Sequence, residues 1–353
     1  MTGTPMKHHI PFLDLRDGGP IAHARARTEA AAALRDACLG RVAPFGRLCL
    51  SPIDKLASNW LRRSASKYRT ELEHVAEILG FPGAVTLNMA YLFACTTQAY
   101  EGPDGLPRIR RTLDWPFQGL GQAVEIAWQS GPAGDFYNAT WPGAVGVLTA
   151  MAPGRFCAVI NQAPMKRRTR GALGFALDAA VNLRDALALE GGWPPDHLLR
   201  YAFESCETFE DAVALIAREP LGRPTLFTLA GVRPGEIALI ERTEREARIF
   251  RRPVIVANDW QDPKPGWQAR MSEANNIARR DAMQAVEPDA PLFSWVTEPV
   301  LNRLTRLAVE MSAVGAGDFV ARGYECPSLI RGEPRAVTQD FHLRATAPTA
   351  LAA

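Results

Sequence analysis

The chain has 353 residues, of which 47% are hydrophobic and 22% are charged. These proportions are typical of a globular protein with a sizeable core and argue against extended disorder. Its 40 basic and 38 acidic residues leave a formal net charge of +2. A net charge this small creates no overall electrostatic attraction to nucleic acid or to an anionic membrane. No apolar run reaches the roughly 18 residues of a membrane-spanning helix, and the N-terminus has no apolar core of signal-peptide length. We therefore expect a cytoplasmic protein without a transmembrane segment.

The six cysteines form no CxxC pair, and no histidine lies at zinc-ligand spacing from them. Six cysteines in a chain of this length do not make a disulfide scaffold. We expect reduced thiols, no metal ion and no cofactor.

Residues 1–30 look rich in loops, and the first clear helix is expected over 29–40, where Gly40 would end it. The stretch from Leu56 to Gly80 has apolar residues at three- and four-residue spacing, which also predicts helix. The segment from Phe81 to Phe93 is apolar all round, which indicates that it is buried.

Strand-like runs separated by turn signals follow, at 108–115, 123–128, 144–152 and 155–161. Two helices are expected over 195–206 and 208–220, the second with Thr208 as its N-cap and Asp211 three residues further on. Strands return at 224–232, 236–243, 246–252 and 253–259, and a last helix is expected over 300–313. Strands gathered in blocks, not alternating with helices, predict an α+β fold with antiparallel sheets and helices layered on them.

Cys95 stands at the head of the first strand block. A thiol is a good nucleophile only as the thiolate, so it needs a base and a nearby positive charge. None of the six histidines lies in a cysteine-protease context. If the chain were cut before Cys95, however, the new α-amine, with an ordinary pKa of about 7.7–8.0, would be a base beside its own thiol. Arg111 and Asp114 follow sixteen and nineteen residues later, and the turn signal "EGPDG" suits a hairpin that returns them to Cys95.

The residues "CTTQAY" and "RTLDWPF" resemble the nucleophile region of the acid ceramidase and N-acylethanolamine acid amidase family, in the choloylglycine hydrolase group of cysteine N-terminal-nucleophile hydrolases. The two departures are Thr97 and Thr112. Further blocks match in order: 71–97, 141–162, 254–261 and 298–319. The resemblance implies a four-layer αββα sandwich of two antiparallel sheets, with a helical N-terminal segment over 1–94 and a catalytic domain over 95–353.

The resemblance also implies a mechanism. Cys95 would attack the carbonyl of Ala94, cut the chain there, and then attack a substrate amide. The catalytic set implied by the family comprises Cys95, Arg111, Asp114, Asn161, Asn258 and Arg270, with Asn258 helping to form the oxyanion hole. The partner would be a small-molecule N-acyl amide in an apolar cleft, and the N-terminal fragment would stay bound after cleavage. Candidate cleft residues are Leu92, Phe93, Trp115, Phe117, Trp141 and Trp260.

Simpler interpretations remain open at this stage. Cys95 could be an ordinary buried cysteine, and Arg111 and Asp114 could form a surface ion pair worth little. Among functions, an acyltransferase or a bile-salt or penicillin-type amide hydrolase would use the same nucleophile. A non-catalytic, lipid-binding relative would not cleave at all. The residues do not specify an oligomeric state or the acyl chain.

Overall fold

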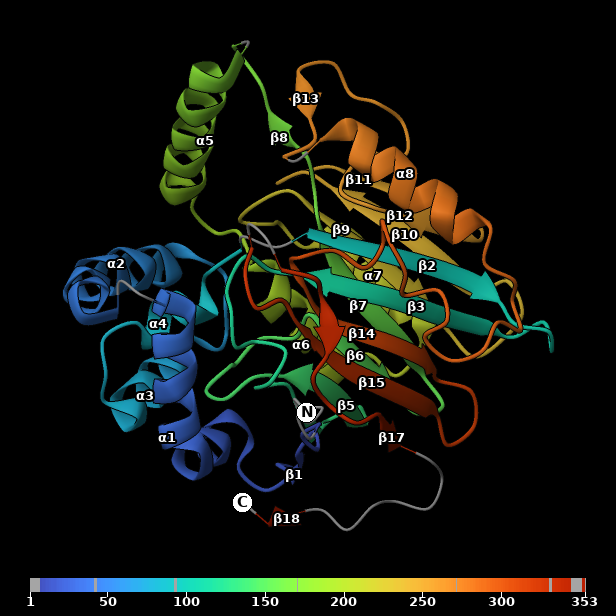
Figure 1. Ribbon diagram of the computed structural model, residues 1–353, viewed down its shortest axis with the longest axis horizontal. Helices are drawn as coiled ribbons and strands as arrows, with labels where there is room; N and C mark the ends of the chain where they lie inside the picture. Colours follow the sequence, from blue (N-terminus) through green and yellow to red (C-terminus); the bar gives the residue numbers. More distant parts are fainter. Residues whose placement is uncertain are drawn as a thin grey trace, which may run out of the picture.

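The computed structural model describes residues 7–40, 43–91, 94–169, 171–270, 272–329, 332–343 and 351–352. Two sheets dominate the fold (Figure 1). The first has nine strands in the order β11 (Ala247–Phe250), β10 (Ile237–Arg242), β9 (Thr225–Ala230), β7 (Phe156–Gln162), β6 (Thr149–Ala152), β5 (Gly134–Thr140), β4 (Glu125–Gly131), β1 (Phe12–Asp14) and β18 (Leu351–Ala352).

The second sheet has seven strands: β12 (Val254–Val256), β2 (Ala94–Glu101), β3 (Pro107–Asp114), β14 (Thr305–Ser312), β15 (Asp318–Glu325) and β16 (Arg335–Ala336) in order, with β17 (Phe341–Leu343) also paired to β15. A separate small ladder joins β13 (Trp267–Gln268) to β8 (Met165–Lys166). Neighbouring strands in these sheets run antiparallel, apart from the two pairs that β1 makes.

Helices cover the outer faces of both sheets. α6 (Pro195–Ser205) and α7 (Phe209–Arg218) pack on the nine-stranded sheet, and α8 (Glu273–Gln284) packs on β2 and β12 of the other. The two sheets face each other through contacts of β2, β3 and β14 with β7 and β9. All seven residues of β7 are buried because one face meets the opposite sheet and the other meets α6. The expected four-layer αββα arrangement is confirmed.

The N-terminal part forms a helical group beside the sandwich: α1 (Gly19–Leu39), α2 (Ala43–Arg63), α3 (Arg69–Leu79) and α4 (Ala84–Asn88) (Figure 1). Gly40 and Gly80 end α1 and α3 as predicted. The expectation of loops throughout 1–30 is wrong, since β1 and the first half of α1 lie there. A further helix, α5 (Gly171–Ala188), contacts α2 through one hydrogen bond: the indole N–H of Trp60 in α2 donates to the Ala186 carbonyl of α5 at 2.8 Å.

The helix expected over 300–313 is also wrong, because this stretch forms β14. Leu307 and Met311 satisfy a helical spacing, but together with Val309 they also satisfy the two-residue period of a strand. Pairing with β3 on one side and β15 on the other decides between the two periods.

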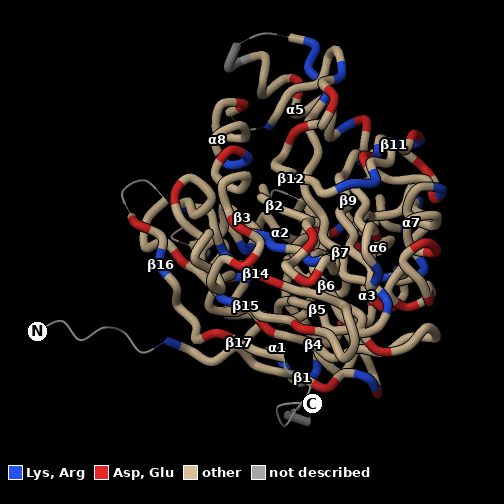
Figure 2. Tube along the Cα trace, turned by 90° about the vertical axis from the view of Figure 1, so that its right-hand side faces the viewer, with Lys and Arg blue, Asp and Glu red and all other residues tan. Residues whose placement is uncertain are grey.

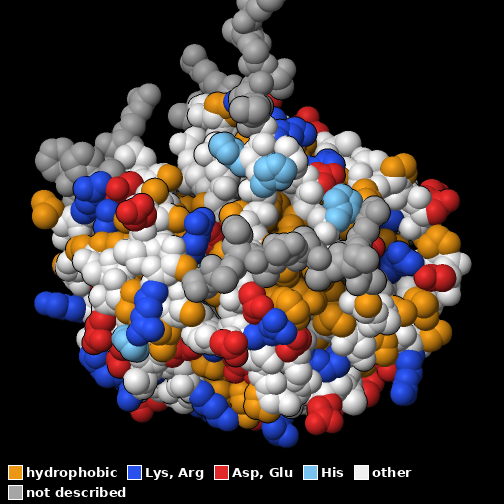
Figure 3. Space-filling view, turned by 90° about the horizontal axis from the view of Figure 1, so that it is seen from below, with side chains coloured by type: hydrophobic (Ala, Val, Ile, Leu, Met, Phe, Trp, Pro, Cys, Tyr) orange, Lys and Arg blue, Asp and Glu red, His pale blue; other side chains and the backbone are white. Residues whose placement is uncertain are grey.

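No helix in the described part of the chain is long and apolar enough to cross a membrane. Basic and acidic residues are interspersed along the trace in Figure 2 and across the face seen in Figure 3. This distribution agrees with the near-zero net charge.

Candidate active site

The β2–β3 hairpin brings Cys95 and Arg111 to the same face of the seven-stranded sheet, as the turn signal predicted. Cys95 pairs with Leu113 and Thr97 pairs with Arg111. Because side chains alternate along a strand, these four residues face the nine-stranded sheet, whereas Thr96 faces α8. Cys95 is fully buried at the start of β2.

Arg111 is the principal partner of the Cys95 thiol. Its Nη2 donates to Cys95 Sγ at 2.6 Å, and the Ile160 carbonyl lies 3.6 Å from the same sulfur. Arg111 Nη1 is held by the Leu148 carbonyl at 3.1 Å and by the Thr149 hydroxyl. Burial raises the pKa of Cys95 to about 11, and the charge of Arg111 opposes part of that rise. The thiol is therefore protonated at neutral pH in the continuous chain, and a base is needed to activate it.

Two asparagines reach the site from neighbouring strands. Asn258 follows β12, which pairs with β2, and its Oδ1 accepts the backbone N–H of Cys95 at 3.0 Å. Its Nδ2 donates to the Gln162 carbonyl at 2.9 Å, so the side-chain amide is fixed at both ends. Asn161, near the end of β7, accepts the Thr97 hydroxyl at 2.8 Å and donates to the Ala257 carbonyl at 3.0 Å.

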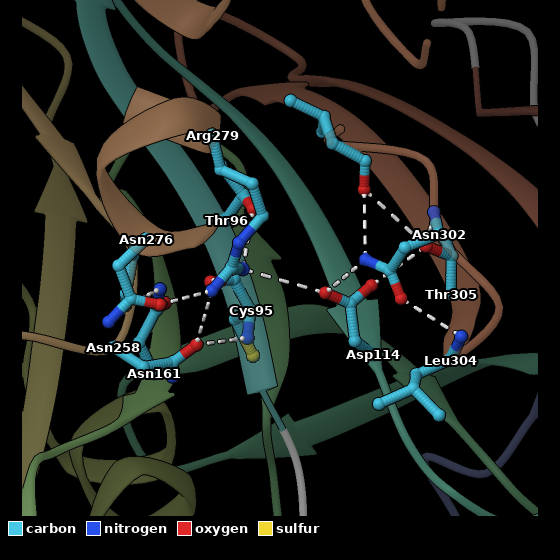
Figure 4. Close-up of polar contacts among 12 residues, drawn as sticks. Cys95, Thr96, Asp114, Asn161, Asn258, Asn276, Arg279, Asn302, Leu304 and Thr305 are labelled. Atoms are coloured by element: carbon cyan, nitrogen blue, oxygen red, sulfur yellow. Dashed lines mark hydrogen bonds and ion pairs between the residues drawn. The ribbon is translucent and has the colours of Figure 1, made fainter. Parts of the chain in front are cut away.

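Arg279 of α8 is a central residue that the sequence analysis missed (Figure 4). It is buried, and its Nη1 donates to the Cys95 carbonyl at 2.8 Å and to the Thr96 hydroxyl at 2.9 Å. Its Nη2 donates to Asn258 Oδ1 at 3.2 Å and to Asn276 Oδ1 at 2.6 Å. One guanidinium thus fixes the backbone of Cys95 and the asparagine that holds its N–H.

Asp114 lies on the opposite face of β3 from Arg111, toward α8 (Figure 4). Its carboxylate is 3.6 Å from Arg279 Nη1 and accepts hydrogen bonds from Asn302 at 3.0 Å and Thr305 at 2.8 Å. Burial raises the pKa of Asp114, while Arg279 and the two hydrogen bonds act in the opposite direction. Asp114 and Arg111 are therefore not a surface ion pair; each has its own buried role.

Arg270 is placed differently from the other candidates. Its Nε donates to the Ala163 carbonyl at 3.1 Å, and no described interaction joins it to Cys95. Its catalytic role stays a prediction. The helix that carries Arg279 has only weak local signals: Ser272 caps α8 by accepting the Asn275 N–H, and the helix is otherwise polar.

An apolar cavity of about 170 Å³ lies between the N-terminal helices and the loops near the hairpin. Three of the candidate cleft residues, Trp115, Phe117 and Trp141, line it together with Leu79 and Leu87. Trp260 does not line it; its ring packs against Trp267 with centroids 5.4 Å apart. Leu92 and Phe93 lie outside the described residues.

The buried thiol, the fixed cation beside it and the fixed backbone N–H form a site suited to nucleophilic attack on a carbonyl. In the described residues, no group of three or more His, Cys, Asp or Glu side chains is arranged to hold a metal ion. All six cysteines are free thiols.

Comparison with known proteins agrees with the family resemblance. No protein-family model matches the chain. A probable acid ceramidase of Caenorhabditis elegans is 27% identical over 290 residues, 74% of this chain and 70% of the relative. An N-acylethanolamine-hydrolyzing acid amidase of Oryctolagus cuniculus is 27% identical over 199 residues, 55% of this chain and about half (52%) of the relative. A solved structure of the C. elegans ortholog of N-acylethanolamine-hydrolyzing acid amidase aligns with a TM-score of 0.47 and 19% identity, over 62% of this chain and 92% of that one.

Proposed function

We propose that this chain, which is related to acid ceramidase and N-acylethanolamine-hydrolyzing acid amidase, is an amidohydrolase that cleaves the linear amide bond of N-acyl amides. The observation that carries the proposal is the environment of Cys95. Its Sγ lies 2.6 Å from a buried arginine, and its backbone N–H is held by Asn258. A buried cysteine with a purely structural role has no need of either contact.

The first step would be cleavage of the chain itself. Cys95 Sγ attacks the carbonyl carbon of Ala94, the C–N bond breaks, and a thioester forms while the α-amine of Cys95 becomes free. Water then hydrolyses the thioester and returns the thiol. Because burial holds the thiol pKa near 11, this step is slow unless a base approaches.

The freed α-amine supplies the base for catalysis. In the continuous chain, the same nitrogen already donates a hydrogen bond to Asn258 Oδ1. The amine is therefore in position before chain cleavage releases it. The amine takes the thiol proton, and the thiolate attacks the substrate carbonyl. The amide C–N bond breaks, the proton passes to the leaving amine, and water hydrolyses the acyl thioester to the free acid and the thiol. Arg111 stabilises the thiolate, and Arg279 with Asp114 fixes the surrounding backbone.

The two fragments would remain associated after cleavage, because the contacts between them are extensive. β1 pairs with β4 through three residues. The Glu125 carboxylate accepts hydrogen bonds from His23 and Arg27 of α1, at 2.7 and 2.6 Å. The helices α2 and α5 join through Trp60. Separation would expose the apolar surfaces that these elements bury.

The apolar cavity at the N-terminal helices would hold the acyl chain. It shares Leu87, Asn88 and Trp115 with a second, smaller cavity that reaches Leu148. The carbonyl of Leu148 is bound by Arg111. An acyl chain in the cavity would therefore have its carbonyl end directed toward the nucleophile.

The proposal is tested with purified wild type and Cys95→Ala, each incubated with N-lauroylethanolamine. Release of laurate by wild type alone supports it. Product analysis with an added amine acceptor distinguishes acyl transfer, which would yield the amide of that acceptor in place of laurate. A wild-type chain that has been cleaved before Cys95 yet releases no acyl product from a panel of N-acyl amides would contradict the proposal and favour a non-catalytic relative.

A further inference from the structure

The guanidinium of Arg111 is held in place by neutral groups. It donates to the Leu148 and Ile160 carbonyls at 3.1 and 3.3 Å, to the Cys95 thiol at 2.6 Å and to the Thr149 hydroxyl. Its Nε is buried and has no hydrogen-bond partner among the described residues. A thiol is a weak acceptor, so the direction of the guanidinium depends mainly on the two carbonyls and the hydroxyl.

Thr149 supplies that hydroxyl from the opposite sheet. It is the first residue of β6 and is fully buried. A β-branched side chain has few χ1 rotamers, so the strand fixes the position of its hydroxyl. The hydroxyl and the Leu148 carbonyl accept hydrogen bonds from the same nitrogen, Nη1 of Arg111. Because a guanidinium is planar and rigid, fixing Nη1 at two points also fixes Nη2, the atom beside the sulfur.

The Leu148 carbonyl alone would not hold this direction, because a carbonyl accepts hydrogen bonds over a broad range of angles. Without the Thr149 hydroxyl, the guanidinium could tilt and still satisfy Nη1 at that carbonyl. A tilt would lengthen the contact of 2.6 Å between Nη2 and Cys95 Sγ. Stabilisation of the thiolate would weaken with it, because the attraction between opposite charges falls with their separation.

Thr228 of β9 offers a comparison within the same sheet. Val159 of β7 pairs with Thr149 on one side and with Thr228 on the other, so the three residues form a row and point to the same face. Thr228 is also fully buried, but its hydroxyl has no hydrogen-bond partner among the described residues. The contact with Arg111 therefore distinguishes Thr149 from an otherwise similar threonine.

We infer that Thr149 is a positioning residue of the catalytic site: its hydroxyl orients the Arg111 guanidinium toward Cys95 Sγ, and both chain cleavage and amide hydrolysis depend on this orientation. The inference rests on the proposed function and adds a residue to it. Thr149 acts only through Arg111, so its effect on the rates should disappear when Arg111 is replaced.

The test is a double-mutant cycle on the full chain. Thr149→Val removes the hydroxyl and keeps the branched shape of the side chain, and it is made in wild type and in Arg111→Gln. Thr149→Ala replaces it in the cycle should Thr149→Val fail to fold. Thr149→Ser keeps the hydroxyl, and Thr228→Val is the matched control. Intact mass gives the rate of chain cleavage before Cys95, and laurate release from N-lauroylethanolamine gives the rate of hydrolysis. Melting temperatures show whether each variant is folded.

Thr149→Val should slow both rates by about tenfold, the loss expected when a hydrogen bond to a charged group is removed. In Arg111→Gln the same substitution should change the rates by less than about twofold. Thr149→Ser and Thr228→Val should also stay within about twofold of wild type.

An equal loss from Thr149→Val with and without Arg111 would overturn the inference, because the hydroxyl would then act by another route. A loss of the same size in Thr149→Ser or Thr228→Val would overturn it as well. If wild type cleaves its chain but hydrolyses no N-acyl amide, the proposed function fails, while the cleavage rates still decide this inference. A wild type that neither cleaves its chain nor hydrolyses an amide would overturn both.

Discussion

The guanidinium of Arg111 and the thiol of Cys95 meet at 2.6 Å inside the sandwich, sixteen residues apart in sequence but on the same face of one hairpin. The contact places a permanent positive charge beside a sulfur whose pKa is raised by burial, and this charge opposes part of that rise. It therefore gives the most direct prediction about reactivity.

Arg111→Gln should slow both chain cleavage and amide hydrolysis by about 10- to 100-fold, because a charge-assisted hydrogen bond to the sulfur is worth about 1.5–3 kcal/mol. The matched control is Arg110→Gln. Arg110 is equally buried but lies on the opposite face of β3, where it donates to the Glu287 and Pro288 carbonyls. Its loss should lower the melting temperature without a comparable effect on the rate per folded molecule. Equal rate losses in the two variants would mean that the Arg111 effect is structural.

Arg279→Gln should reduce kcat by at least about tenfold, since the Cys95 carbonyl, Asn258 and Asp114 would all lose a shared donor. Arg280→Gln provides the control. Arg280 is the next residue in the helix, but its side chain is partly exposed and pairs with Asp259 outside this network. Steady-state kinetics of the cleaved proteins separates kcat from KM. If Arg280→Gln proved as damaging as Arg279→Gln, disruption of α8 would explain both results.

Asn258→Ala should lower kcat by about 10²–10³, the loss typical of one oxyanion-hole donor, while KM changes little. The expected role requires Asn258 Nδ2 to reach the substrate oxygen, although in the continuous chain it donates to the Gln162 carbonyl. Asn182→Ala, on α5, serves as the control. An unchanged kcat in Asn258→Ala would restrict Asn258 to holding the Cys95 nitrogen.

The free energy of unfolding should fall as the pH rises above about 9. Burial raises the pKa of Cys157 from 9.0 to about 12, so between these values the unfolded chain loses a proton that the folded chain keeps. The stabilising contribution is complete below pH 9 and is lost on the way to pH 12, at up to about 1.4 kcal/mol per pH unit for each such group. Thermal melts should show a shallower decline for Cys157→Ala than for wild type, and an unaltered decline for the exposed Cys49→Ala. Parallel curves for wild type and Cys157→Ala would contradict this account.

The ends of helices α3 and α7 could be predicted from the sequence, because single capping residues set them. Thr208 accepts the Asp211 N–H at 3.1 Å as the expected cap of α7, and Gly80 ends α3 in the left-handed conformation that glycine tolerates. The strand β14 could not be predicted in this way, because its sequence fits two periods and only pairing with β3 and β15 selects one.

The same distinction holds in the site. The hairpin turn predicted the proximity of Cys95 and Arg111, which depends on a local return of the chain. Arg279 contacts Cys95 although the two residues are 184 positions apart in sequence. It lies on a polar helix whose sequence lacks the regular apolar spacing that would predict it. Which of several arginines completes the site is decided by packing of α8 on β2, a tertiary contact that spacing along the chain does not encode.

The central claim is that Cys95 becomes an N-terminal nucleophile, and an intact mass spectrum of freshly purified protein tests it most directly. Wild type should give two fragments that separate between Ala94 and Cys95, whereas Cys95→Ala should remain one chain of 38.6 kDa. A wild-type protein that stays whole after incubation across a range of pH would contradict the account, because the thiol would then lack the α-amine that activates it.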